Sequence, residues 1–176
     1  EGKEVFAFVP HEMMEKQKNA FIGSGKYEGS GKNDLFYGVD GPWVAHTQYV
    51  SKSDGTLTVK DSGRKASDEE NAQNLIGMQW VYGGLRMGGK SYYALDLTDI
   101  EKPELKFHIN PDADNASAAL KQMGQSWSKP TLAYVNWGDT RKLVMFVGGG
   151  YDPIYETHNA NPSSTKGNGV YMFDAH

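Results

Sequence analysis

Apolar residues gather in short runs along the chain, and glycine or proline separates one run from the next. The clearest stretch is residues 79–99, where Trp80-Val-Tyr82 leads into Gly83-Gly84 and a second apolar run follows Ser91. Short runs rich in aromatic and β-branched residues, bounded by glycine, are typical of strands. We therefore expect two strands, at residues 78–82 and 91–97, joined by a glycine-rich turn.

The same strand-pair unit recurs near the end of the sequence. Residues 142–152 form an apolar run that leads into three glycines, and residues 167–175 supply a second run after another glycine. The second runs end alike, since Tyr93-Ala-Leu-Asp96 matches Tyr171-Met-Phe-Asp174. A third, partial copy opens the chain at residues 4–10. Such recurrence indicates a radial β architecture.

Further strands are expected where apolar runs are bounded by turn residues or alternate with polar positions. They cover residues 4–9, 35–39, 42–50, 56–60, 104–109, 131–137, 142–147 and 170–174. Residues 42–50 and 56–60 are expected to pair as a hairpin across Ser53-Asp-Gly55, with Leu57 and Val59 on its buried side.

Helical patterns are confined to short segments. Residues 11–21 are a helix candidate. Met13, Met14 and Gln17 are expected on one side of it, with Phe21 at the next turn. Residues 115–123 have helical composition. Residues 61–77 are interpreted as a polar surface insertion with a helical turn, for which Ser67 and Glu70 would form a capping box.

These elements predict a mainly β protein, a partial β-propeller with short helical insertions. The strands group into about two to two and a half four-stranded blades, fewer than the four to eight that close a propeller. We divide residues 1–176 into a blade tail at 1–10, a blade at about 35–109 and an incomplete blade at about 126–176. The chain begins at Glu1 and runs directly into an expected strand, so we interpret it as one piece of a larger propeller domain.

Composition supports the β prediction and excludes several kinds of function. The chain has 21 glycines among 176 residues, roughly 12% against a typical ~7%. Its formal net charge is −4, which argues against nucleic acid as a partner, because neutralising phosphates requires a basic face. It contains no cysteine, so disulfides, zinc–thiolate sites and thiol catalysis are excluded. No apolar run is long enough to predict a membrane span.

One stretch matches the phosphate-binding pattern Gly-x-x-x-x-Gly-Lys-Ser/Thr at every position. It is Gly84-Leu-Arg-Met-Gly-Gly-Lys-Ser91. A phosphate loop needs a helix directly after it, because the amides and dipole of that helix help to bind the phosphates. The residues that follow, Tyr92-Tyr-Ala-Leu-Asp-Leu-Thr98, favour a strand. We therefore interpret the match as a glycine hairpin. The glycines of 23–32 likewise miss the dinucleotide pattern and are interpreted as a loop.

No catalytic, cofactor-binding or metal-binding residues are predicted. The histidines are His11, His46, His108, His158 and His176, and no two share metal-ligand spacing on one element. Asp112-Ala-Asp114-Asn115 begins like a calcium loop, but Ser117 stands where the invariant glycine should be. We expect Asp96 and Asp174 to bond backbone amides of the turns after their strands. Packing between blades is expected for Trp80, Trp127, Trp137 and the tyrosines, and stacking against a sugar or a cofactor ring is the alternative.

Six short motifs, in order along the chain, resemble one family. They are Glu4-Val-Phe-Ala-Phe-Val-Pro10, Tyr37-Gly-Val-Asp-Gly41, Gly83-Gly-Leu-Arg-Met-Gly-Gly89, Tyr93-Ala-Leu-Asp96, Ser126-Trp-Ser-Lys-Pro130 and Gly148-Gly-Gly-Tyr-Asp152. The set is similar to the C-terminal propeller of the tip-associated proteins of type IV pili, the PilC/PilY group. The resemblance covers most of the chain.

The resemblance implies a quinoprotein-like propeller in an exported bacterial protein, located at the pilus tip or outer cell surface. It implies a non-enzymatic role in pilus biogenesis, twitching motility and adhesion. The partners implied are the minor pilins of the tip complex and a host or surface receptor. The calcium loop of the family has no match here and would lie outside this chain, so the resemblance transfers no site residue and no cofactor. Two alternatives remain open on the same fold: a quinone-dependent dehydrogenase and a carbohydrate-binding propeller.

Overall fold

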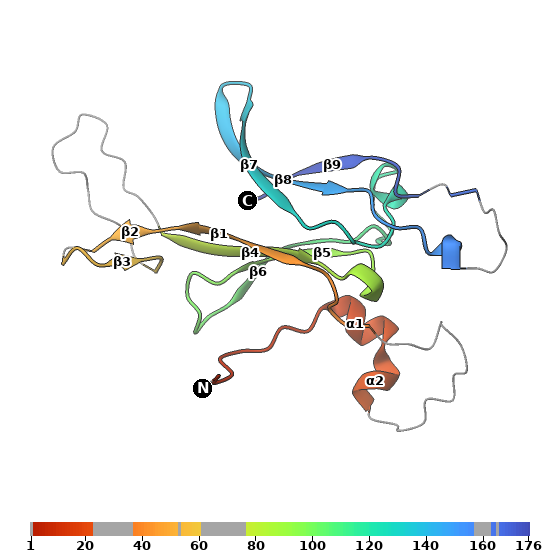
Figure 1. The fold of residues 1–176 in the computed structure, drawn as a ribbon, viewed down its shortest axis with the longest axis horizontal. Helices are drawn as coiled ribbons and strands as arrows, with labels where there is room; N and C mark the ends of the chain where they lie inside the picture. Colours follow the sequence, from red (N-terminus) through yellow and green to blue (C-terminus); the bar gives the residue numbers. More distant parts are fainter. Residues whose placement is uncertain (1, 23–36, 53, 61–76, 157–162, 165) are drawn as a thin grey trace.

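A computed structural model describes residues 2–22, 37–52, 54–60, 77–156, 163–164 and 166–176 of the chain. Its described part is mainly β, with short helices at the N-terminal end (Figure 1). The strands form three antiparallel sheets of four, two and three strands, and none of them closes on itself. The structure therefore confirms the mainly β prediction. None of the described helices is long and apolar enough to cross a membrane.

The first large sheet is the four-stranded unit that the sequence predicts. Its strands lie in the order β1-β4-β5-β6, and each pairs antiparallel with its neighbours. Their bounds are β1 (Trp43–Gln48), β4 (Met78–Gly84), β5 (Tyr92–Asp96) and β6 (Glu104–Ile109). Because β5 begins directly after the glycine turn, the interpretation of that turn as a hairpin is confirmed.

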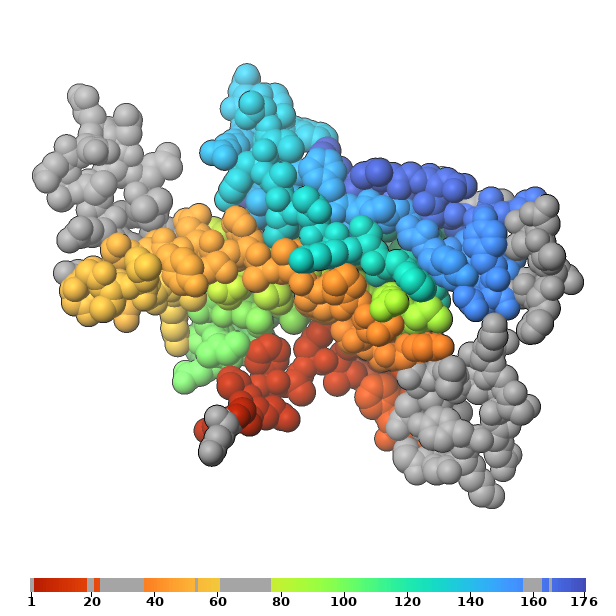
Figure 2. Space-filling view, viewed as in Figure 1, coloured from red at the N-terminus to blue at the C-terminus, as the bar shows by residue number. Residues whose placement is uncertain are grey.

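The second large sheet is the predicted incomplete unit. It has three described strands in the order β7-β8-β9. Their bounds are β7 (Thr131–Trp137), β8 (Thr140–Gly148) and β9 (Val170–Asp174). Gly138 has φ +60° at the turn between β7 and β8, a left-handed conformation that favours glycine. This hairpin projects from the body of the molecule (Figure 2), and its first strand ends at Trp137.

The two large sheets pack against each other, with the second lying over the first (Figure 1). Side chains alternate along each strand, so every second residue points into the shared core. That core contains Trp80, Tyr82, Tyr92, Ala94, Met123, Leu143, Met145, Val147 and Ala175. The Tyr82 hydroxyl donates a hydrogen bond to the Ala175 carbonyl at 2.8 Å, which joins the sheets inside this core. The predicted packing role of Trp80 is confirmed.

The N-terminal segment covers the opposite side of the first sheet. Its helices are α1 (His11–Lys16) and α2 (Lys18–Ile22), which confirms the helix prediction apart from a break at Gln17. Met13 is buried with Leu85 and Tyr93, whereas Met14 is exposed. The prediction that Met14 lies on the same side as Met13 is wrong, because consecutive helical side chains point about 100° apart, and only Met13 reaches the sheet.

Three predicted elements differ from the structure. Residues 4–9 form no strand in the described part of the chain, because they run without a partner strand even though Phe8 packs on Tyr93. Residues 37–39 also form no strand, and 35–36 lie outside the described residues. Within 115–123 the structure has a single 3-10 turn, η3 (Leu120–Gln122). The Ser117 side chain accepts from Leu120 N at 3.1 Å, a local bond that favours a turn over a longer helix.

The predicted hairpin is present but short. It consists of β2 (Val50–Ser51) and β3 (Leu57–Thr58), while residues 43–48 pair with β4 instead. Leu57 is exposed, contrary to the prediction. Residues 61–76, with the expected capping box of Ser67 and Glu70, lie outside the described residues.

Candidate functional site at the glycine turns

The glycine-rich turns of the two large sheets meet at one end of the molecule. The chain leaves β4 through Leu85 and η2 (Arg86–Gly88), and this turn contacts the segment 124–128 that leads into the second sheet. At Gly84 an added Cβ atom would lie 2.6 Å from the Ser126 carbonyl oxygen. Glycine is required there because two backbones approach too closely for any side chain.

Ser126 holds the two sheets together at these turns. It is fully buried, and its Oγ accepts from Leu85 N at 2.7 Å and donates to the Gly89 carbonyl at 3.1 Å. Its own backbone N–H donates to the same Gly89 carbonyl at 3.0 Å, and its carbonyl accepts from Arg86 N at 3.2 Å. One side chain and one peptide unit thus fix the position of the whole η2 turn.

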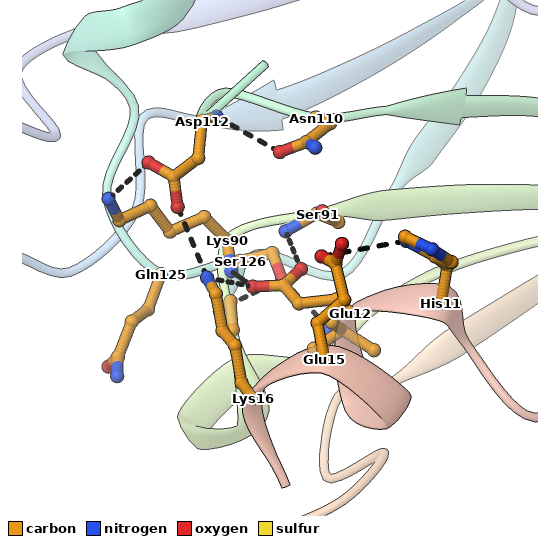
Figure 3. Close-up of polar contacts among 12 residues, drawn as sticks. His11, Glu12, Glu15, Lys16, Lys90, Ser91, Asn110, Asp112, Gln125 and Ser126 are labelled. Carbon is orange, nitrogen blue, oxygen red and sulfur yellow. Dashed lines mark hydrogen bonds and ion pairs between the residues drawn. The ribbon is translucent and has the colours of Figure 1, made fainter. Parts of the chain in front are cut away.

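The stretch that resembles a phosphate loop binds a carboxylate from its own chain. Glu12 of α1 is buried, and its carboxylate accepts from the backbone N–H of Lys90 at 3.4 Å and of Ser91 at 3.3 Å (Figure 3). The Lys16 ammonium lies 2.7 Å from the same carboxylate. An added Cβ at Gly89 would lie 2.3 Å from Glu12 Oε1. These contacts dock α1 on the turn.

Asp112 completes this charged cluster. Its two carboxylate oxygens accept from Lys90 Nζ at 2.7 Å and from Lys16 Nζ at 3.1 Å (Figure 3). Burial by itself raises the pKa of Asp112, but the hydrogen bonds from Lys90 and Lys16 hold it below its ordinary value. The cluster contains two carboxylates and two ammonium groups, so its charges offset one another. We interpret it as a structural lock on α1.

The carboxylates that follow the matching strands behave as the sequence predicts. Asp96 accepts from Thr98 N at 2.9 Å, and Asp174 accepts from His176 N at 3.1 Å. Both therefore bond the backbone of the turn after the strand, and the prediction is confirmed. The second oxygen of Asp96 accepts from Trp80 Nε1 at 2.8 Å.

Among the described residues, no group of three or more His, Asp or Glu side chains is placed to hold a metal ion. His108 stacks on Tyr93 with ring centroids 4.3 Å apart, and burial lowers its pKa. His46 and His176 both lie against Trp80, at 6.2 and 4.9 Å between ring centroids. His158 lies outside the described residues.

Three aromatic rings form a row on the surface beside the glycine turns. The Trp127 and Tyr151 centroids lie 5.1 Å apart, and the Tyr151 and Tyr155 centroids lie 6.1 Å apart. Tyr155 belongs to η4 (Pro153–Glu156). The Arg86 guanidinium lies 4.7 Å from the centroid of the Trp127 ring. Their segments adjoin one another on the face seen in Figure 2. We call these three rings the aromatic row.

The sequence did not reveal the aromatic row. Packing between blades was expected for Trp127 and Trp137, yet they are 37% and 55% exposed, so that prediction is wrong for both. Arg86 is predicted only as part of a glycine motif, and Tyr151 is not singled out among the tyrosines. A signal was nevertheless available in the three motifs at 83–89, 126–130 and 148–152, which carry the family resemblance. They supply Arg86, Trp127 and Tyr151, which lie next to one another in the structure.

No family model matches the chain. The chain is 29% identical over 157 residues to the type IV pilus biogenesis factor PilY1 of Pseudomonas aeruginosa, in strains PAO1 and PAK alike. The matched region covers 88% of this chain.

This chain is related to the PilY1 family. The resemblance found in the motifs is thereby confirmed. The chain spans about a tenth of the length of the curated PilY1 proteins, since the match covers 10% of them. The crystal structure of the C-terminal domain of Pseudomonas aeruginosa PilY1 aligns with 97% of this chain and 26% of that one, at 22% identity and a TM-score of 0.47.

Proposed function

We propose that this chain is a non-enzymatic β-propeller module of a type IV pilus biogenesis protein. The observation that carries the proposal is the 29% identity to PilY1 over 157 residues. The site geometry supports a structural role, because Glu12 and Asp112 both pair with lysines, and Glu12 also accepts from the backbone of the glycine turn. We infer no catalytic residue.

The propeller arrangement has support in how the sheets pack. Each large sheet is an antiparallel meander, and the two share one core, as neighbouring blades do. The face of the second sheet that points away from this core is also apolar. On it Val170 is 77% and Met172 40% exposed, and Phe146 lies opposite Met172 in the register. In a larger propeller this face would pack against a further blade.

By analogy with PilY1, the protein would be exported and would act at the pilus tip or outer cell surface. Its partners there would be the minor pilins of the tip complex and a surface or host receptor. In this role it would support pilus assembly, twitching motility and adhesion. The exposed loops and the aromatic row are the surfaces best suited to such contacts, because loops on a rigid scaffold commonly carry recognition.

The test is a clean deletion of the gene that encodes this chain in its native bacterium. Surface pili would be counted by electron microscopy, twitching would be measured on agar, and the protein would be located by immunogold labelling. We expect few or no pili, loss of twitching, and gold at pilus tips or the outer surface of complemented cells. Normal piliation after deletion, or label confined to the periplasm, would overturn the proposal.

A further inference from the structure

We propose that the aromatic row of Trp127, Tyr151 and Tyr155 binds a saccharide, with Arg86 beside Trp127 and Glu156 beside Tyr151 supplying polar contacts. The inference rests on the proposed function, because it names the ligand class that an adhesive module would contact. It concerns a surface formed by η2, the segment before β7 and η4, which lie far apart in the sequence.

The three rings contribute to neither buried cluster of the protein. Trp127 is 37% and Tyr155 52% exposed, whereas Trp80 is buried in the core. Exposing aromatic surface to water costs free energy, and contiguous exposed apolar side chains commonly mark a contact site. A ligand that covers the rings would remove that cost.

Hydrogen bonds hold the row in a fixed arrangement. Gln125 and Tyr151 exchange backbone hydrogen bonds at 2.7 and 3.0 Å. The Gln125 side chain accepts from Trp127 Nε1 at 3.0 Å, and the Tyr151 hydroxyl donates to Glu156 at 2.7 Å. Behind them the buried Ser126 ties Arg86 to the same segment. A binding surface that is already ordered loses little entropy when its ligand binds.

The chemistry of the row matches a sugar ring. A pyranose presents one face of C–H groups, which packs on an aromatic ring, and a rim of hydroxyls that both donate and accept. Successive rings are tilted by 42° and 41°, which makes the surface curved. Around it stand a guanidinium, an amide and a carboxylate, from Arg86, Gln125 and Glu156. These groups suit hydroxyls.

A protein partner fits less well. A stable protein interface buries about 800 Å² on each partner around an apolar centre. The contacts of the row described above come from the polar or charged side chains of Arg86, Gln125 and Glu156. We therefore commit to a saccharide and treat a protein partner as an outcome of the test.

The experiment measures binding of soluble sugars to the purified protein. Saturation-transfer NMR would screen the methyl glycosides of glucose, galactose, mannose and N-acetylglucosamine at millimolar concentration, and titration calorimetry would follow each hit. Trp127→Ala and Tyr155→Ala each remove one ring. Trp137→Ala is the matched control, since Trp137 is an exposed tryptophan at the tip of the β7–β8 hairpin, outside the row. Circular dichroism would verify that each variant is folded.

We expect at least one glycoside to bind, with affinity falling about tenfold or more in folded Trp127→Ala and Tyr155→Ala and unchanged in Trp137→Ala. Binding of no glycoside would overturn the inference, as would equal losses in all three variants. A photo-cross-linker placed at position 127 would test the protein alternative. If it captures a protein and no glycoside binds, the aromatic row is a protein interface instead. None of these outcomes depends on piliation, so failure here is distinguishable from failure of the proposed function.

Discussion

Ser126→Ala tests whether one buried hydroxyl holds the two sheets in register at the glycine turns. The substitution removes the acceptor of Leu85 N at 2.7 Å and the donor to the Gly89 carbonyl at 3.1 Å. The Gly89 carbonyl keeps its bond from Ser126 N, because that bond comes from the backbone. The Leu85 N–H loses its side-chain acceptor, and Leu85 is fully buried.

The expected loss of stability follows from the Leu85 N–H, which is left buried without an acceptor. Leaving a buried donor without a partner destabilises a protein by about 1–3 kcal/mol. For a chain of this size each kcal/mol lowers the Tm by about 2–4 °C. We therefore expect a fall in Tm of about 2–12 °C. The midpoint of urea unfolding should fall while the slope m stays constant, because the change does not alter the surface exposed on unfolding.

Ser128→Ala is the matched control for this measurement. The Ser128 hydroxyl donates only to the neighbouring Lys129 carbonyl, at 3.4 Å on the exposed side of the chain. Its loss should change stability by less than about 0.5 kcal/mol. If Ser126→Ala destabilises the protein no more than Ser128→Ala does, the assignment of a cross-sheet role to Ser126 is wrong.

Three other predictions concern the docking of α1 and the outer face of the second sheet. Gly89→Ala should displace Glu12, since its Cβ would lie 2.3 Å from the carboxylate. Limited proteolysis should then cut the N-terminal segment faster. Gly148→Ala is the control and should not change the rate of cleavage, because the nearest atom to its Cβ is 3.8 Å away. The pKa of Asp112 is lower in the folded protein than its ordinary 3.8, so its contribution is present above that value and is lost as the pH falls through the folded pKa. Between pH 5 and pH 2 the free energy of unfolding, measured in urea, should therefore fall less steeply in Asp112→Asn than in the wild type. If it falls equally steeply in both, the assignment of the charged cluster as a structural lock on α1 is wrong. The uncovered apolar outer face of the second sheet should make this chain self-associate, and Val170→Lys, on a side chain that is 77% exposed, should reduce that association in analytical ultracentrifugation without lowering the Tm.

Much of the strand pattern was predictable because it depends on local sequence. Residues 104–109, 131–137 and 170–174 were expected as strands and form β6, β7 and β9 with those bounds. Alternating apolar positions and turn residues act within a few residues of each other. The tendency of Asp96 to bond the next turn is local in the same way.

Other elements could not be predicted because their state depends on a distant partner. Residues 4–9 have the composition of a strand but have no strand beside them in the described part of the chain, and a strand requires hydrogen bonds from a neighbour. Leu57 alternates as a buried residue would, yet it is 65% exposed on its two-stranded ribbon in the described part of the chain. The composition of a segment predicts a strand whether or not a partner strand or packing neighbour lies beside it.

At the candidate site, too, the local pattern was predictable from the sequence and the contacts between distant segments were not. The sequence alone excluded a phosphate loop at Gly84–Ser91, because a strand pattern follows it directly. It did not show that Glu12, far away in the chain, supplies the anion that this turn binds. It also did not bring Arg86, Trp127 and Tyr151 together, since they belong to separate segments that meet only when the sheets pack.

What the sequence by itself determined is the mainly β class, the grouping of strands into repeated units, and the resemblance to PilY1, because periodicity and motifs are properties of neighbouring residues. Only the tertiary structure decided which exposed side chains meet at the glycine turns, because the aromatic row and the lock on α1 arise from contacts between segments far apart in the chain. Such contacts depend on how the two sheets pack face to face, which local pattern does not encode.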